Sequence, residues 1–194
     1  RPEVVLACNS WNHQPYAMPV FYHANTYIGL LAIHDQNSDR VWTELAWSTD
    51  TTNWHRIDEG QPFIQCSEHI LDYDYGCVYA CATPIFLDDE IRIYYGGSDG
   101  LHTSWRNGCH ALATIPPDGF AGYQQVNTKK IGVINTPIFK QTGQAIKITT
   151  DIKENGWLEA NLYDEKNEPV ATKRIYDTST DKLVFAPQIT RLNA

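Results

Sequence analysis

Basic residues are scarce in this chain of 194 residues. Lysine and arginine number 15 against 23 aspartates and glutamates, which gives a formal net charge of -8. A protein that binds duplex nucleic acid or an anionic membrane needs a basic surface. The longest apolar run, residues 27–33, is far shorter than the roughly 20 residues of a membrane-spanning helix. The sequence therefore predicts neither a nucleic-acid partner nor a membrane partner.

Metal-ligand motifs are also lacking. None of the five cysteines has the spacing of a zinc-binding set, and the seven histidines are scattered along the chain. Calcium is conceivable because the chain is acidic, but no dense loop of oxygen ligands is present. We therefore predict no cofactor and no metal ligand.

The odd cysteine count leaves two interpretations open. Cys77 and Cys81 would lie about 13 Å apart on one strand, so they cannot pair with each other there. The cysteines are either buried free thiols or disulfides of a secreted protein with one thiol left over. The sequence contains no N-x-S/T glycosylation site that would help to assign a compartment.

Helical periodicity is missing over any stretch longer than two turns. Short segments rich in β-branched and aromatic residues alternate instead with turn sequences such as 96–100 and 116–119. The fold class predicted is all-β. The predicted strands are 20–22, 27–33, 41–47, 78–87, 91–95, 145–150 and 157–163.

An internal repeat organises the first two thirds of the chain. The tripeptide at Pro19 (PVF) recurs 65 residues later at Pro84 (PIF), and the dipeptide LA at Leu45 recurs 67 residues later at Leu112. Each unit is predicted to hold four strands, and repeated four-stranded units are typical of propeller blades. The alternative is a pair of unrelated β-meanders. The predicted strands are 16–22, 27–34, 41–48 and 54–57 in the first unit, and 76–87, 91–97, 109–115 and 120–125 in the second.

The character of the sequence changes after residue 125. Residues 145–149 and 157–163 alternate between apolar and polar side chains, and Asn155-Gly156 and Lys166-Asn167 predict hairpin turns. We predict a blade region at 1–126, with blades at about 14–60 and 72–126, followed by a small β-sandwich module at 127–194.

Several motifs resemble the five-bladed propeller glycoside hydrolases of families 32 and 43. They are YAMPVF at 16–21, LAWSTD at 45–50 with Trp54, ATPIF at 82–86, and IRIYYGG at 91–97 with His102. The tail from residue 136 to 170 is similar to the β-sandwich that often follows such propellers. The resemblance implies a partial propeller of two blades, carbohydrate as the partner, and a secreted, extracellular location.

The chain is much shorter than the resemblance requires. Two blades cannot close a ring, and their open edges would expose unpaired backbone groups. We expect a companion chain or a second copy to cover this edge, unless the chain is a fragment. The sequence begins with Arg1 and no signal-peptide pattern follows, so we expect a processed or excised product.

The resemblance also locates the catalytic carboxylates that such enzymes need. Glycoside hydrolysis uses two of them, and in the resembled families the general acid lies two residues before a proline that opens an inner strand. That proline is Pro19 or Pro15, which places Ala17 or His13 at the acid position. Neither residue is a carboxylate. We therefore predict no catalytic residue and no hydrolysis by the chain alone.

Three sets of side chains are candidates for substrate binding, because they carry the aromatic and polar groups that sugar recognition requires. Asp72, Tyr73, Asp74 and Tyr75 precede an inner strand, although a solvated acidic loop would look the same. His102 follows a glycine-rich turn and resembles a recurrent histidine at the funnel floor of those propellers; the alternative is a structural histidine. The third candidate, which could equally pack the blade edge, is the cluster of His13, Gln14 and Tyr16 beside Trp11.

Three functions follow from these observations. The first is a carbohydrate-recognising or structural module derived from a glycosidase-like propeller, without its own catalytic carboxylate pair. The second is a segment of a glycoside hydrolase whose remaining blades lie on another chain. The third is a subunit of a structural or storage protein. Whether the chain belongs to an enzyme therefore stays open. The missing carboxylates argue against it, and a glycoside hydrolase is the class expected if it does.

Overall fold

The computed structural model describes residues 2–139 and 143–186. Thirteen β-strands and no helix occur in this part of the chain, so the all-β prediction is confirmed. The chain divides into two compact units, one of residues up to 121 and one from residue 122 on. No helix among the described residues is long and apolar enough to cross a membrane.

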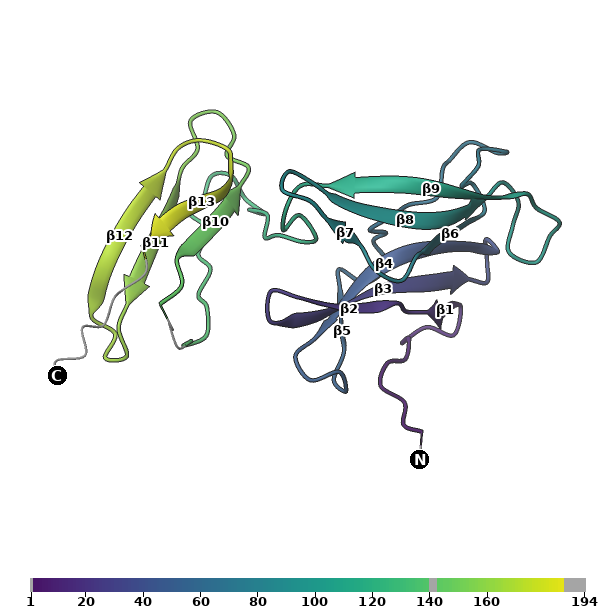
Figure 1. Cartoon of the computed structure of the whole chain (residues 1–194), viewed down its shortest axis with the longest axis horizontal. Helices are drawn as coiled ribbons and strands as arrows, with labels where there is room; N and C mark the ends of the chain where they lie inside the picture. The colour runs from purple at the N-terminus through teal and green to yellow at the C-terminus, as the bar shows by residue number, and fades with distance from the viewer. Residues whose placement is uncertain (1, 140–142, 187–194) are drawn as a thin grey trace. The chain divides into compact units, whose positions relative to one another are not determined.

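The first unit begins with a group of antiparallel strands that is four strands wide (Figure 1). Strands β1 and β2 both pair with one edge of β3, β4 pairs with the other edge, and β5 pairs with β4. The break between β1 and β2 falls at Pro19, which has no N–H to donate to the ladder; its carbonyl accepts the N–H of Leu30 at 2.9 Å. The bounds are β1 His13–Ala17, β2 Val20–His23, β3 Thr26–Asp35, β4 Arg40–Ser48 and β5 His55–Ile57.

The second group repeats this plan with one strand fewer. Strands β6 and β7 both pair with one edge of β8, and β9 pairs with the other edge. As at Pro19, a break at Pro84 separates the two strands that share one edge of the central strand, here β6 and β7 on β8. The bounds are β6 Cys77–Ala80, β7 Ile85–Phe86, β8 Ile91–Ser98 and β9 Gly108–Ile115.

The prediction of a fourth strand in this group, at residues 120–125, is wrong. Phe120 packs its ring into the core at 5.5 Å from Phe21, but no strand follows it, and Tyr123 is 87% exposed. Residues 121–125 lack the alternation of apolar side chains that would hold a strand against a sheet. The second group is therefore three strands wide.

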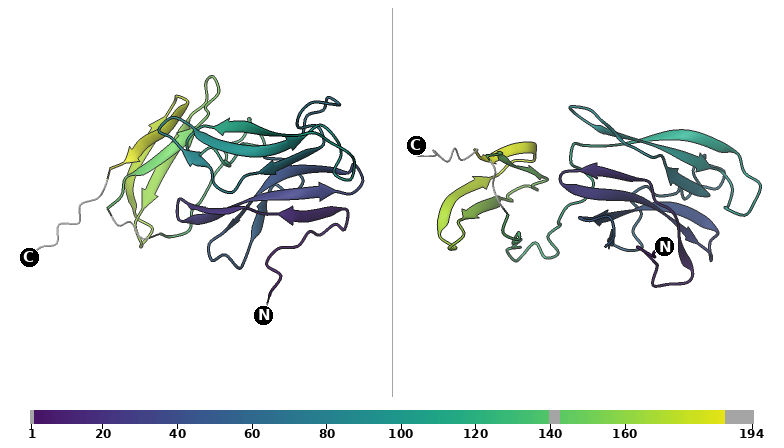
Figure 2. Two further views of the ribbon diagram at one scale, coloured as in Figure 1. Left: turned by 45° about the vertical axis from the view of Figure 1, so that its right-hand side comes forward. Right: turned by 60° about the horizontal axis from the view of Figure 1, so that its bottom comes forward.

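The two groups join at a single parallel pairing, Val41 with Cys77, and Figure 2 shows them from two further sides. The core of the unit lies where apolar side chains from both groups meet. Leu30 and Leu45 come from the first group, and Val78, Ile91 and Ile93 from the second; all five are at most 4% exposed. Burial of this apolar area, at about 25 cal/mol per Å², is the main stabilising term for such a unit.

The five cysteines, all of which lie in the described residues, are free thiols. Cys66 and Cys77 are buried, and burial raises the pKa of the Cys66 thiol to about 11. Of the two interpretations left open by the sequence, the structure thus shows free thiols.

The second unit consists of two two-stranded antiparallel sheets, β10 with β13 and β11 with β12. The turn at Asn167 joins β11 and β12 as a hairpin, with Asn167 at a φ of 65°. The turn at Asn155-Gly156 instead connects strands of different sheets, so the hairpin predicted there is wrong. The bounds are β10 Ile146–Thr150, β11 Leu158–Tyr163, β12 Pro169–Ile175 and β13 Ser179–Phe185.

Candidate functional site

The candidate site lies at one end of the first unit, where strand ends from both groups converge. Strand β3 ends there, β1 and β6 begin there, and the β8–β9 loop returns there. The antiparallel registers produce this convergence, because His13 pairs with Asp35 and Cys77 pairs with Ser98. A backbone bond from the N–H of His102 to the carbonyl of Asp39, at 2.8 Å, ties the β8–β9 loop to the β3–β4 turn.

Two histidines and one aspartate meet at this junction, and we call them the His34–Asp39–His102 cluster. His34 Nε2 lies 3.1 Å from Asp39 Oδ1, and His102 Nδ1 lies 3.9 Å from the same oxygen. The two imidazole rings are 4.3 Å apart between centroids. The pKa of His102 is lowered, first by burial and then by the neighbouring His34, so this imidazole is neutral at neutral pH.

Two tyrosines stand beside the cluster. The ring of Tyr16 lies edge-on to His102, with centroids 5.0 Å apart, and 5.8 Å from the ring of Tyr79. Tyr16 is 56% exposed, so one side of its ring faces solvent. Burial, followed by the nearby Cys77 thiol, raises the pKa of Tyr79 well above its usual value, so this phenol stays protonated.

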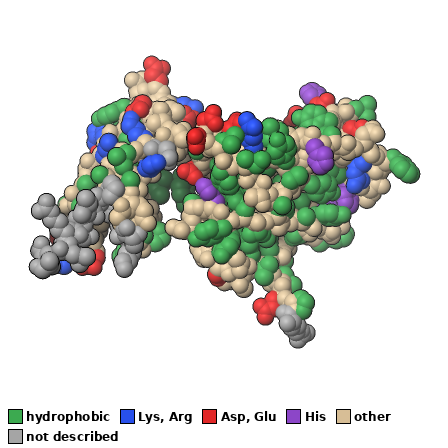
Figure 3. All heavy atoms as spheres, viewed as in Figure 1, with side chains coloured by type: hydrophobic (Ala, Val, Ile, Leu, Met, Phe, Trp, Pro, Cys, Tyr) green, Lys and Arg blue, Asp and Glu red, His purple; other side chains and the backbone are tan. Residues whose placement is uncertain are grey.

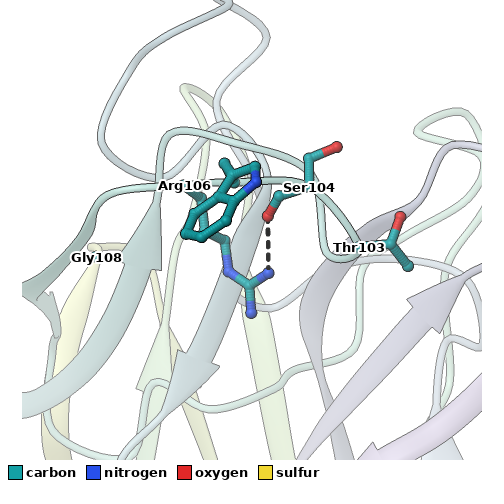
Figure 4. A pocket seen from close by; sticks show the side chains of 5 residues that line it. Thr103, Ser104, Arg106 and Gly108 are labelled. Atoms are coloured by element: carbon teal, nitrogen blue, oxygen red, sulfur yellow. Dashed lines mark hydrogen bonds between the residues drawn. The ribbon is translucent and has the colours of Figure 1, made fainter.

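The β8–β9 loop forms an open pocket next to the cluster, and Figure 4 shows its lining side chains. Arg106 donates hydrogen bonds to the backbone carbonyls of Leu101, His102 and Ser104, which fixes the shape of the loop. Trp105 is fully exposed. An indole held on a fixed loop and open to solvent is a platform on which a flat ligand can stack.

The structure brings some of the predicted site residues together. Tyr16 and His102 are in contact, and Gln14 pairs with His34 in the register of β1 and β3, which places Gln14 on the same face. His13 instead packs its ring edge-on against Trp42, at 5.5 Å, and lies 3.6 Å from Asp35.

The predicted residues at 72–75 make internal contacts. Asp74 accepts a hydrogen bond of 2.9 Å from the hydroxyl of Tyr95, and Asp72 accepts one of 2.6 Å from the hydroxyl of Ser67. The guanidinium of Arg40 lies over the ring of Tyr75, 4.6 Å from its centroid. The hydroxyls of Tyr73 and Tyr95 lie 3.5 Å apart, and Tyr73 is 57% exposed. These contacts hold the loop against β8 and the first residue of β4.

The sequence also contains a G-x-S-x-G pattern at Gly96–Gly100, which in some hydrolases carries a serine nucleophile. That motif needs a sharp strand-to-helix turn that exposes the serine. Here Ser98 is buried at the end of β8, its hydroxyl donates to the carbonyl of Gly100 at 3.0 Å, and a loop to β9 follows. The pattern is therefore part of the turn and does not present a nucleophile.

Sequence reasoning missed His34, Asp39, Tyr79, Trp105 and Arg106. His34 and Asp39 flank a turn and are five residues apart, a spacing that by itself predicts no site. The site forms only because the fold brings His102 of the second strand group next to them. Trp105 and Arg106 carried a usable signal, because an aromatic and a cation stand between Gly100 and Gly108 in a predicted loop.

Comparisons of the chain with protein-family models, curated proteins and solved structures gave no match. The function must therefore be argued from the side chains of this chain.

Proposed function

We propose that this protein is a carbohydrate-recognising module derived from a glycosidase-like propeller, without a catalytic carboxylate pair of its own. The observation that carries the proposal is the cluster of exposed aromatic and polar side chains at one end of the first unit. Trp105 and Tyr16 are exposed aromatic rings; Arg106 lines the pocket with Trp105, and His102 contacts Tyr16. Gln14 lies on the same face as His34, opposite it in the register. Ring stacking together with a few polar groups suits sugars, which have apolar ring faces and hydroxyl edges.

The proposed lack of a catalytic pair rests on the side chains at two positions of β1 and on the bonding of Asp39. Ala17 and His13, the two positions at which the resemblance expects a general acid, carry no carboxylate, and both lie on β1. Asp39 already accepts two hydrogen bonds from Thr103, through its N–H at 2.9 Å and its hydroxyl at 2.6 Å. A carboxylate held in this way favours its charged form and is a poor general acid.

A glycan array followed by calorimetry tests recognition. We expect saturable binding to at least one sugar, and we expect Trp105→Ala to weaken it by about tenfold or more, since loss of a stacking aromatic costs about 1–3 kcal/mol in comparable ring-on-ring sites. Tyr123→Ala is the matched control, because Tyr123 is also highly exposed but belongs to the second unit. Binding to no sugar would remove recognition and leave a structural or storage role.

One observation favours a segment of a glycoside hydrolase as the second candidate. Val20 and Tyr22 on β2, Ile85 on β7 and Leu112 on β9 are each more than 40% exposed, and Figure 3 shows many hydrophobic side chains at the surface of this unit. Exposed apolar side chains on strands are typical of a surface that another chain covers.

Native mass spectrometry of the protein as isolated from its source separates the two candidates. A heavier complex with a second polypeptide and glycan hydrolysis would support the enzyme segment. A single chain or a homo-oligomer that binds sugar without cleaving it would support the recognition module.

A further inference from the structure

The His34–Asp39–His102 cluster has the composition of a metal site. One nitrogen from each histidine and one oxygen of Asp39 all lie within 4.8 Å of one another. Three ligand atoms bound to tetrahedral zinc at 2.0–2.2 Å would lie roughly 3.3 Å apart. The separations from Asp39 Oδ1, 3.1 Å to His34 Nε2 across a hydrogen bond and 3.9 Å to His102 Nδ1, lie on either side of this value.

One of these ligand atoms has no hydrogen-bond partner among the residues that the structure describes. It is His102 Nδ1, which is buried, although buried polar atoms are nearly always paired. Its neighbour in the cluster is the Asp39 carboxylate. A cation between the carboxylate and the two rings would satisfy this nitrogen.

The surroundings hold the aspartate in a suitable orientation. Thr103 donates two hydrogen bonds to Asp39 Oδ2, which leaves Oδ1 directed at the imidazoles. Outer hydrogen bonds of this kind orient the ligands of protein metal sites. The three side chains are only 12%, 22% and 17% exposed, so the cluster is mostly shielded and still reachable from solvent.

We propose that His34, Asp39 and His102 bind a divalent transition-metal ion, with Zn²⁺ as the best match. Two imidazole nitrogens and one carboxylate oxygen are ligands that zinc prefers, and three protein ligands leave a fourth position for water or a ligand. Calcium is a poor match, because it takes six to eight oxygen ligands. The metal site stands on its own observations and does not depend on sugar recognition.

Calorimetric titration of the chelator-treated full chain with ZnCl₂ tests the proposal. We expect one saturable site per chain, and at least about 100-fold weaker binding in His102→Ala, because loss of even an outer partner costs 10–100-fold in metal affinity. His34→Gln should weaken binding similarly. His69→Ala, at an exposed histidine in the 67–75 segment, is the matched control and should bind as the unaltered chain does.

Two readouts do not depend on any variant. Zn²⁺ should shift the imidazole NMR signals of His34 and His102 and leave that of His69 in place. Co²⁺ should give the intense visible absorption of a tetrahedral site without thiolate charge-transfer bands, which excludes binding by the free cysteines. The proposal is overturned by the absence of saturable Zn²⁺ binding, by NMR shifts at other histidines, by thiolate bands, or by a preference for Ca²⁺.

Discussion

The carboxylate of Asp50 organises the turn between β4 and β5. It accepts the backbone N–H groups of Thr52 at 2.9 Å and Asn53 at 2.8 Å, and the side-chain amide of Asn53 at 2.7 Å. The backbone and side-chain bonds from Asn53, followed by the backbone bond from Thr52, hold the pKa of Asp50 far below its usual range. Such bonds favour the charged carboxylate.

We therefore expect a pH-dependent effect of Asp50→Asn. A carboxyl whose pKa is depressed by folding stabilises the protein above its unfolded pKa of about 3.9, and this stabilisation is lost as pH falls toward the folded pKa. The variant should melt at a lower temperature than the wild type at pH 6, and the difference should shrink below about pH 4. Thermal unfolding followed by circular dichroism measures this, with Asp88→Asn as the exposed control. A constant difference across pH would contradict it.

Glu44 is a second residue whose environment decides its role. It is fully buried in β4, and its carboxylate accepts hydrogen bonds from Arg56 at 2.5 and 3.0 Å, from the indole of Trp42 at 2.9 Å and from the N–H of Gly60 at 3.2 Å. Both carboxylate oxygens are therefore satisfied. A buried charge is tolerated only when it is paired and bonded in this way.

Removal of this carboxylate should be costly. We expect Glu44→Leu to lower the free energy of unfolding by about 3–5 kcal/mol, because Arg56 is left buried without its main partner. The double variant Glu44→Leu with Arg56→Met should recover part of that loss. Urea unfolding measures both, and a double variant no more stable than the single one would show that the ion pair is not the source of the effect.

At the scale of elements, strand β8 shows how a two-sided strand is specified. Ile91, Ile93 and Tyr95 are buried on one face, whereas Arg92 and Tyr94 lie on the other and are more exposed. The sequence alone predicted this strand, because the alternation is visible. It did not predict β12, whose seven residues PVATKRI bury only Ile175, so no apolar face marks it as a strand.

The two faces of β8 should respond differently to truncation. We expect Ile93→Ala to lower the free energy of unfolding by about 2–5 kcal/mol, because it leaves a cavity in the core. Arg92→Ala on the opposite face removes an ion pair with Glu90 that is largely open to solvent, and should cost less than about 1 kcal/mol. Chemical denaturation of both variants checks this. Equal losses would mean that the two faces are not distinct.

At the scale of the whole molecule, residues 121–139, which precede the first strand of the second unit, form an exposed segment. Every described residue from 121 to 139 is exposed and none is in a strand. Backbone that lacks a hydrogen-bonded ladder and buried side chains opens at little cost, which is what a protease requires.

Limited digestion with trypsin should therefore cut first after Lys129 or Lys130. We expect two fragments that divide the chain there, identified by mass spectrometry, while the first unit stays intact. A double variant, Lys129→Gln with Lys130→Gln, should survive longer under the same conditions. Early cuts after Arg40 or Arg56, within or next to the sheets, would argue against this division.

The candidate site was predictable only in part. Tyr16 and Gln14 were predicted from residue type, and His102 from the family resemblance. In the structure Tyr16 contacts His102, and Gln14 lies opposite His34 at the same end of the first unit. The role of residues 72–75 in packing was not visible, because an acidic and aromatic loop looks the same whether it contacts a ligand or Tyr95.

The sequence by itself determined the all-β class, most strands of the first unit and the turns between them, because alternation and turn chemistry act over a few residues. Only the tertiary structure decided that His34 and Asp39 meet His102 and that Trp105 and Arg106 stand beside them. These features depend on contacts between segments more than 60 residues apart, such as the bond from Thr103 to Asp39, and no local pattern records which distant segment a side chain will reach.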